Sequence, residues 1–338
     1  MIFDNIIHGQ SCNNTLLSCM RKVLLTHESS PLNTFLFYNQ FFNLNNLSKQ
    51  SVQNIFNCIT AWELASDRVI VFVDMGINEK TLGVLQQYET EYSHQKIEFR
   101  MLADNIPKEV SDILDSNYSL LEKCAKINNF LPNDEITKEI AEIMSANEAV
   151  YPKHLPEKFN TYYQEHEAQA GQEIPIRCIV ESPFAGDIDR NIEYAAEAIS
   201  SLVLGGKYAP MASHLLYTRM LDDDDKDERM LGIDAGLNYG AKAEETIVFV
   251  DRGLSTGMKY GIINAEKAGR KYSFATLSKD PDIVKQVSKI TTLEELEKWC
   301  EQMKIENEEI FKKNGFLVDL NFDKKKSIIA ESQKIEFV

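Results

Sequence analysis

The chain has 338 residues, which at roughly 150 residues per domain allows two domains or one large one. Hydrophobic residues make up 43% and charged residues 26%, a composition typical of globular proteins. The net charge of −16 argues against a nucleic-acid partner. No apolar run approaches the roughly 18 residues of a membrane span, and the first residues lack a signal-peptide pattern. We therefore expect a cytoplasmic protein with no nucleic-acid or membrane partner.

Two further patterns bear on metal binding. The six cysteines contain no C-x-x-C pair and are widely spread, which predicts buried thiols and no zinc cluster. The acidic run at 222–225 resembles the start of a calcium loop, but Asp227 and Ile233 stand where an EF-hand needs Gly and Glu. We expect a solvated loop there, with neither a metal ion nor a cofactor.

An internal repeat organises the chain. Residues 68–77 (RVIVFVDMGI) and 245–254 (ETIVFVDRGL) share six identical residues at an offset of 177. Residues 30–42 align with 209–221 at an offset of 179, and the identical pairs are Pro31/Pro210, Leu36/Leu215 and Tyr38/Tyr217. Two collinear matches predict an internal duplication.

The first copy covers residues 1–104, and its first strand is poorly marked. Residues 105–172 are polar, helix-prone and punctuated by prolines, which predicts a helical linker. The second copy covers residues 173–278. The C-terminal segment, 279–338, predicts a charged helix at 292–312 and then a β-hairpin at 316–337.

Strands and helices alternate in the second copy. Apolar runs at 176–180 and 246–250 predict buried strands, and 209–217 is expected to be extended. Helical periodicity covers residues 191–204, 226–242 and 258–268. This alternation predicts an α/β protein: two tandem flavodoxin-like (Rossmann-like) halves, each a doubly wound parallel sheet, joined by the linker.

Candidate binding residues follow the predicted strands of the second copy, because ligands bind at the carboxyl ends of strands in open α/β sheets. Two loops lead into helices, where backbone N–H groups can hold phosphate or sugar hydroxyls. Neither loop carries a P-loop or G-x-G-x-x-G motif. The candidate ligand-binding residues are Ser182, Pro183, Phe184, Gly186, Asn191, His214, Arg229, Ser255, Thr256, Gly257 and Lys259.

Four motifs of the second copy carry a resemblance: SPFAGD with Asn191, ASHLLYT (212–218), DERMLGIDAGL (227–237) and VDRGLSTGMKYGI (250–262). Together they resemble the nucleoside 2-deoxyribosyltransferase-like superfamily, in a branch found in bacteria and phages, over about residues 176–277. The resemblance implies a flavodoxin-like fold that binds a nucleoside or nucleotide. It also implies enzymes in which a glutamate attacks the anomeric carbon of an N-glycoside.

The sequence departs from that family at one position. The family motif G-T-x-x-E-x-G aligns with residues 255–261, so Lys259 stands in place of the glutamate. Lysine cannot form the glycosyl ester, which leaves Asp187, Glu228 and Asp251 as candidate catalytic carboxylates. Asp251 recurs as Asp74 in the first copy, which suits a structural role as well as a ligand contact.

Two functions from different classes follow. One is a non-catalytic nucleotide binder, for example a phage anti-defence sponge of an immune signalling nucleotide, which Lys259 and the degenerate first copy favour. The alternative is an N-glycosidic-bond hydrolase or deoxyribosyltransferase. A purely structural protein would leave the polar loops without a purpose. Because family members are commonly oligomeric, a homo-oligomer is compatible with the sequence. In a single chain, we expect the first copy to act as a partner that closes the pocket of the second.

Overall fold

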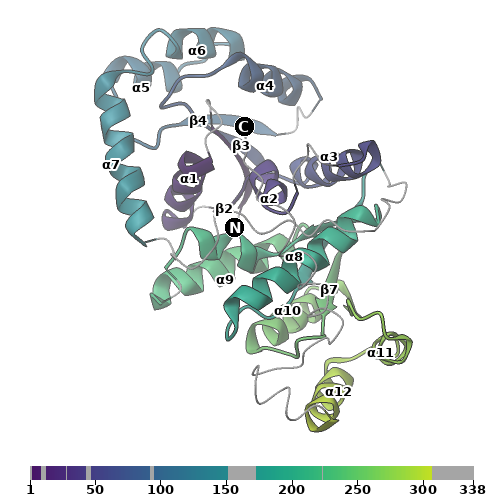
Figure 1. Cartoon of the computed structure of the whole chain (residues 1–338). Helices are drawn as coiled ribbons and strands as arrows, with labels where there is room; N and C mark the ends of the chain where they lie inside the picture. Colours follow the sequence, from purple (N-terminus) through teal and green to yellow (C-terminus); the bar gives the residue numbers. More distant parts are fainter. Residues whose placement is uncertain are drawn as a thin grey trace. The chain divides into compact units, whose positions relative to one another are not determined.

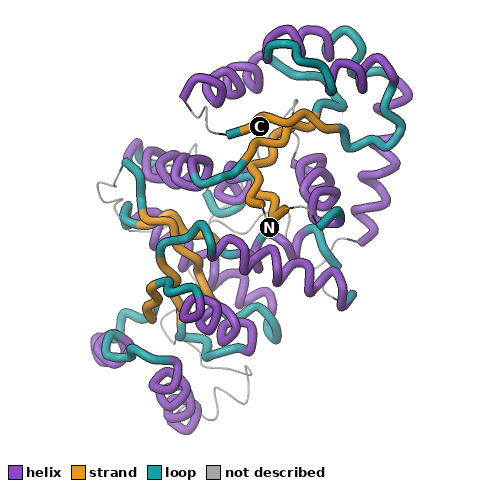
Figure 2. Tube along the Cα trace, turned by 180° about the vertical axis from the view of Figure 1, so that it is seen from behind, coloured by secondary structure: helices purple, strands orange, loops and turns teal. Residues whose placement is uncertain are grey.

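The computed structural model describes residues 2–8, 13–27, 29–42, 47–91, 95–150, 173–222 and 224–306. It is an α/β protein with two separate four-stranded sheets, each flanked by helices (Figures 1 and 2). Both sheets are entirely parallel, and a helical region joins them along the chain. The predicted fold class is therefore confirmed. No helix within the described ranges combines the length and apolar character needed to cross a membrane.

The first sheet has the strand order β2-β1-β3-β4. Its strands are β1 (Ile2–His8), β2 (Ser29–Leu32), β3 (Arg68–Phe72) and β4 (Lys96–Arg100). The helices between them are α1 (Asn13–Leu25), α2 (Thr34–Asn39), α3 (Lys49–Leu64) and α4 (Glu79–Glu91). The region that follows contains α5 (Lys108–Leu114), α6 (Leu120–Ile127) and α7 (Asp134–Val150), as the polar, helix-prone composition predicts.

The second sheet has the equivalent order, β6-β5-β7-β8. Its strands are β5 (Ile176–Glu181), β6 (Tyr208–Met211), β7 (Glu245–Phe249) and β8 (Lys271–Ala275). The helices between them are α8 (Ile188–Leu204), α9 (Lys226–Gly240) and α10 (Thr256–Lys267). All five residues of β7 are buried, as expected for a central parallel strand. Beyond β8 lie α11 (Pro281–Val287) and α12 (Leu293–Glu306), which pack on the same core as α10.

Strand register supports the duplication. In the first sheet Asp4 of β1 pairs with Pro31 of β2 and Arg68 of β3. In the second, Cys178 of β5 pairs with Pro210 of β6 and Glu245 of β7. Pro210 and Glu245 are the repeat equivalents of Pro31 and Arg68. The third pairing also matches, because Arg68 lies opposite Lys96 and Glu245 opposite Lys271. Two sheets with the same order and register are the expected product of an internal duplication.

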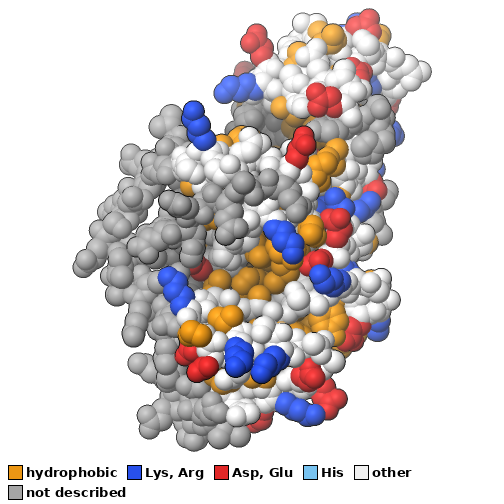
Figure 3. All heavy atoms as spheres, turned by 90° about the vertical axis from the view of Figure 1, so that its right-hand side faces the viewer, with side chains coloured by type: hydrophobic (Ala, Val, Ile, Leu, Met, Phe, Trp, Pro, Cys, Tyr) orange, Lys and Arg blue, Asp and Glu red, His pale blue; other side chains and the backbone are white. Residues whose placement is uncertain are grey.

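The chain forms two compact units that do not follow its linear order. Unit 1 contains 1–37, 62–155 and 216–239, and unit 2 contains 38–61, 156–215 and 240–338. The first sheet belongs to unit 1 and the second to unit 2. On the face drawn in Figure 3, basic and acidic side chains are interspersed.

Three expectations differ from the structure in detail. The predicted extended stretch 209–217 ends at Met211 and continues as short 3-10 turns at Ser213–Leu215 and Tyr217–Arg219. β6 is an edge strand with a partner on one side alone, so it lacks the cross-strand bonds that would prolong it. The poorly marked first strand is present as β1. The predicted terminal hairpin lies outside the described residues.

Candidate functional site

The candidate site of unit 2 lies where β5, β6 and β7 end. Strand β5 connects through α8 to β6 on one side, whereas β7 continues through α10 to β8 on the other. Right-handed crossovers in opposite directions place α8 and α10 on opposite faces of the sheet. The loops after β5 and β7 therefore diverge at a topological switch point, where open α/β sheets bind their ligands.

Ser182 and His214 meet at this edge. Ser182 follows β5 directly, and its Oγ lies 2.9 Å from His214 Nε2, which comes from the turn after β6. The Phe184 ring packs edge-on to the imidazole, with ring centroids 6.1 Å apart. Burial lowers the pKa of His214 to about 4, so the imidazole is neutral near pH 7. A neutral imidazole can donate one hydrogen bond and accept another.

The loop 182–187 is fixed by the helix that follows it. Asn191 of α8 is fully buried and donates through Nδ2 to the carbonyl oxygens of Phe184 and Ala185, at 3.0 and 2.9 Å. Its Oδ1 accepts from Arg252 Nε at 2.9 Å, which ties the loop after β5 to the loop after β7. Gly186 has φ 97°, in the region that favours glycine. Pro183 is buried in the same loop, so the predicted residues form a rigid turn.

Asp187 and Ser255 cap the two helices that begin at this edge. Asp187 accepts from the backbone N–H of Arg190 at the start of α8. Ser255 accepts from the backbone N–H of Met258 at the start of α10. Thr256 and Gly257 are exposed in the first turn of α10. These two residues are therefore accessible to a ligand beside the helix N-terminus.

Glu181 is a polar residue of this site that the motifs did not indicate. It is the last residue of β5, and its carboxyl group lies so close to Gly261 of α10 that a Cβ there would overlap it. Burial raises the pKa of Glu181 to about 8, although the charge of Arg270 opposes the shift. A charged residue at the end of an apolar strand was the available signal, and the repeat equivalent in β1 is Ile7.

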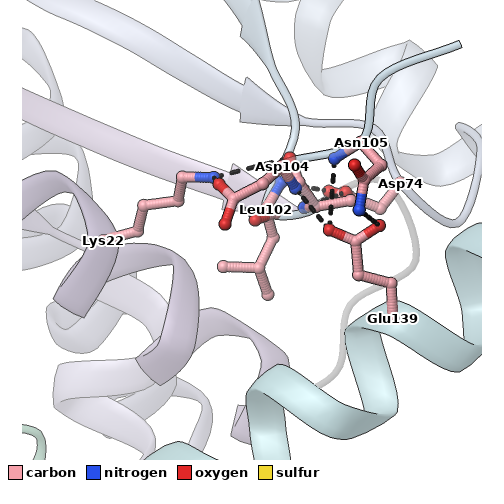
Figure 4. Close-up of polar contacts among 7 residues, drawn as sticks. Lys22, Asp74, Leu102, Asp104, Asn105 and Glu139 are labelled. Atoms are coloured by element: carbon pink, nitrogen blue, oxygen red, sulfur yellow. Dashed lines mark hydrogen bonds and ion pairs between the residues drawn. The ribbon is translucent and has the colours of Figure 1, made fainter.

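Asp251 shares one contact with its repeat equivalent, Asp74: each accepts from the backbone N–H of the equivalent leucine after the fourth strand, Leu277 or Leu102. Asp251 is buried and accepts hydrogen bonds from the hydroxyls of Tyr194 and Thr276 and from the backbone N–H of Leu277. Asp74 accepts from the backbone N–H groups of Leu102 and Ala103, at 2.8 and 2.9 Å (Figure 4). Both carboxylates thus join the loop after the third strand to the segment after the fourth, which accounts for their presence in both copies.

The remaining candidates make contacts of their own. Lys259 Nζ forms an ion pair with Glu297 of α12, at 2.6 Å. Glu228 and Arg229 are on α9, which belongs to unit 1. There Glu228 pairs with both terminal nitrogens of Arg21, at 2.5 and 2.6 Å, and Arg229 is exposed. The three candidate catalytic carboxylates are therefore divided between the two units.

Metal ligands are not clustered in the part of the chain that the structure describes, where no three His, Cys, Asp or Glu side chains converge. Cys19, Cys58, Cys124, Cys178 and Cys300 are buried free thiols. Burial raises the pKa of Cys58 and Cys178, which keeps both thiols protonated and unreactive near pH 7.

A separate cavity of about 460 Å³ lies in unit 1 beside β4. It is lined by Lys96–Phe99 of this edge strand and by residues of α4 and α6. Lys123 lies on its wall and donates to the carbonyl oxygens of Leu114 and Ser116, at 2.8 and 2.9 Å. This lysine therefore holds the connection between α5 and α6.

One family model matches the chain: a domain of unknown function, DUF7768, over residues 177–275. The matched region begins in β5 and ends in β8, so it covers the second sheet and the loops of the candidate site. Comparisons with curated proteins and with solved structures gave no match.

Proposed function

We propose that unit 2 binds a nucleoside- or nucleotide-like ligand at the carboxyl ends of β5, β6 and β7. One observation carries the proposal: the two sheets share order and register, yet two polar residues at this edge of the second sheet have apolar equivalents in the first. Glu181 and His214 occupy the positions of Ile7 and Phe35. Since the first sheet has apolar residues there, folding does not require the polar ones, and a ligand gives them a purpose.

The ligand class rests on the resemblance of residues 176–277 to the nucleoside 2-deoxyribosyltransferase-like superfamily, together with the chemistry of the edge. Ser182 and neutral His214 offer hydrogen bonds to sugar hydroxyls or a base, and Phe184 offers a partly exposed aromatic ring. Thr256 and Gly257 at the start of α10 suit an anionic group.

We favour binding without catalysis, for example sequestration of a signalling nucleotide by a phage protein. The Asp251 carboxylate accepts from three donors, and Asp187 serves as a helix cap. Glu228 is neutralised by Arg21 in unit 1. These contacts account for all three carboxylates without a catalytic role.

Glu181 favours a second candidate function, cleavage of an N-glycosidic bond. Its carboxyl group lies against α10 at Gly261, two residues beyond Lys259, which stands at the family's glutamate position. With a pKa of about 8, the group is mostly protonated at neutral pH and can act as a general acid toward a leaving base.

One experiment separates the two functions. The purified protein is incubated with adenosine, AMP, dAMP, NAD and a cyclic dinucleotide, desalted, and then denatured for mass spectrometry. An intact nucleotide released on denaturation supports the binder, whereas free base in solution supports the enzyme. If none of these compounds gives either a retained nucleotide or a free base, the proposal is contradicted.

Two variants connect the result to the site. Removing the Ser182 hydroxyl (S182A) or the His214 imidazole (H214A) is expected to reduce retention at least about fivefold, because each loses a direct hydrogen bond. Lys271→Ala is the matched control, since Lys271 is exposed and lies at the amino end of β8, the opposite edge of the same sheet. Circular dichroism verifies that each variant folds.

A further inference from the structure

The two compact units exchange equivalent segments of the repeat. Unit 1 includes residues 216–239 from the second half of the chain, and unit 2 includes residues 38–61 from the first half. The repeat aligns Tyr38 with Tyr217 at an offset of 179, and Trp62 with Tyr239 at an offset of 177. The exchanged segments thus correspond to within a residue at both ends, so the exchange is reciprocal.

The contacts inside each unit are reciprocal as well. In unit 2, Tyr38 Oη donates to the carbonyl oxygen of Pro210, at 2.9 Å. In unit 1, Tyr217 Oη lies 3.2 Å from the carbonyl oxygen of Pro31, which also accepts from Tyr239 Oη at 2.7 Å. Tyr38 is the repeat equivalent of Tyr217, and Pro31 is the repeat equivalent of Pro210. Each unit therefore holds a tyrosine of one repeat against the edge-strand proline of the other repeat.

Each proline lies in an edge strand, which has unpaired backbone groups on its outer side. Proline has no N–H, so its carbonyl group is the one polar backbone group it contributes. The tyrosine hydroxyl supplies a donor to that carbonyl. Tyr38 and Tyr217 are both buried, at 0% and 2% exposure, so these hydrogen bonds are shielded from water.

Residues 38–61 make three further polar contacts in unit 2. Asn54 Nδ2 donates to the carbonyl oxygens of Val203 and Leu204 at the end of α8, at 3.2 and 3.4 Å. Cys58 Sγ lies 3.4 Å from the carbonyl oxygen of Tyr208 in β6. Arg177 of β5 donates to the carbonyl oxygen of Ala61, at 3.5 Å. The segment therefore forms hydrogen bonds with backbone groups at the end of α8 and in β6, and it accepts one from β5.

We infer that residues 38–61 are an integral part of the ligand-binding unit and that Tyr38 is a positioning residue for its site. The inference rests on the proposed function in one respect, the assignment of that site. Pro210 lies four residues before His214, so Tyr38 fixes the end of β6 from which the imidazole projects. The first half thus completes the site of the second through a segment built into its core.

Hydrogen–deuterium exchange on the full chain tests the inference without a ligand. Tyr38→Phe is expected to accelerate amide exchange at least threefold in peptides covering 208–221, far away in the sequence. Tyr217→Phe is expected to have a smaller effect in peptides covering 29–42, because Tyr239 Oη still donates to the carbonyl oxygen of Pro31. Tyr88→Phe is the matched control, because it removes another buried tyrosine hydroxyl, one that accepts from Asn5 within unit 1. Effects of Y38F confined to peptides of residues 29–61 would overturn the inference.

A second variant covers the case in which Tyr38→Phe fails to fold. Asn54→Ala is expected to accelerate exchange at least threefold in peptides covering 197–207, where its side chain meets the end of α8. Protection there equal to that of the unmodified chain would contradict an integral role for the segment.

Ligand retention then tests the positioning role of Tyr38. In the desalting assay with AMP, Y38F is expected to retain at least threefold less nucleotide than Y88F. If Y38F accelerates amide exchange but leaves AMP retention unchanged, the positioning role is contradicted. The place of residues 38–61 in unit 2 is then still supported. If the unmodified chain retains no compound of the panel, the proposed function fails, while the exchange experiment still decides the segment's place.

Discussion

The carboxyl edges of the two sheets differ although the sheets beneath them correspond strand by strand. Both keep the aspartate after the third strand, Asp74 or Asp251, and a glycine at positive φ two residues later, Gly76 at 76° or Gly253 at 83°. At the end of β1 and of its equivalent β5, by contrast, the residues differ: Ile7 in the first sheet and Glu181 in the second. The shared residues build the fold, and the residues found in one copy are those that the proposed function uses.

The largest expected effect sharpens this comparison at Gly261. A valine there (G261V) would drive its side chain into the Glu181 carboxyl group under α10, and we expect the free energy of unfolding to fall by about 3 kcal/mol. Urea denaturation measures the change. Gly83→Val is the control, because a Cβ at Gly83 of α4 meets no atom within 4 Å.

A double variant identifies the cause of that loss. Adding Glu181→Ala to G261V removes the overlapping carboxyl group and is expected to restore more than half of the lost stability. If the two changes were additive, the close packing of Glu181 on Gly261 would be the wrong explanation.

Asp251→Ala and Asp74→Ala test the shared part of the two sheets. Each leaves buried donors without an acceptor, and we expect each to lower the free energy of unfolding by about 2 to 3 kcal/mol. Thermal or urea unfolding of both variants provides the comparison. A loss for Asp74→Ala alone would show that Asp251 is retained for a ligand and not for the fold.

Glu181 makes the stability of unit 2 depend on pH, whereas its equivalent in unit 1, Ile7, does not titrate. Its folded-state pKa of about 8 exceeds the ordinary 4.5, so the stabilising state is the protonated one. This contribution is complete below pH 4.5 and is lost as the pH rises to about 8. Relative to Glu181→Gln, the unmodified chain should lose at least about 1 kcal/mol of stability over that range.

Urea denaturation of both proteins at pH 5 and pH 8.5 measures the difference. Glu181→Asp is a second comparison, because it keeps an ionisable group on a shorter side chain. A difference that does not vary with pH would mean that the carboxyl group is well solvated in the folded protein.

Lys259→Ala is expected to have the smallest effect. Its ion pair with Glu297 is half-exposed on both sides, so removing it should change the free energy of unfolding by less than about 1 kcal/mol. Because the side chain pairs with α12, nucleotide retention should also be unchanged. A large loss of nucleotide retention in this variant would instead show that Lys259 contributes to ligand binding, as the sequence motifs predict.

The sequence by itself determined the duplication, the α/β class and most helices and strands of the second copy. These properties are local: hydrophobic periodicity, helix caps and apolar strand runs can be recognised within short windows. The pairing of Ser182 with His214 was also within reach, because both follow parallel strands whose carboxyl ends lie on one edge.

The tertiary structure decided how the candidate residues are grouped. Glu228 and Asp251 are acidic residues near the same predicted cleft in the sequence, yet one pairs with Arg21 in unit 1 and the other is enclosed in unit 2. Glu181 gains its raised pKa from burial under a helix that begins 75 residues later. The reciprocal exchange of residues 38–61 and 216–239 leaves no local signal, because its contacts join positions 116 or more residues apart. Burial and long-range hydrogen bonds depend on which segments meet, and only the folded chain specifies that.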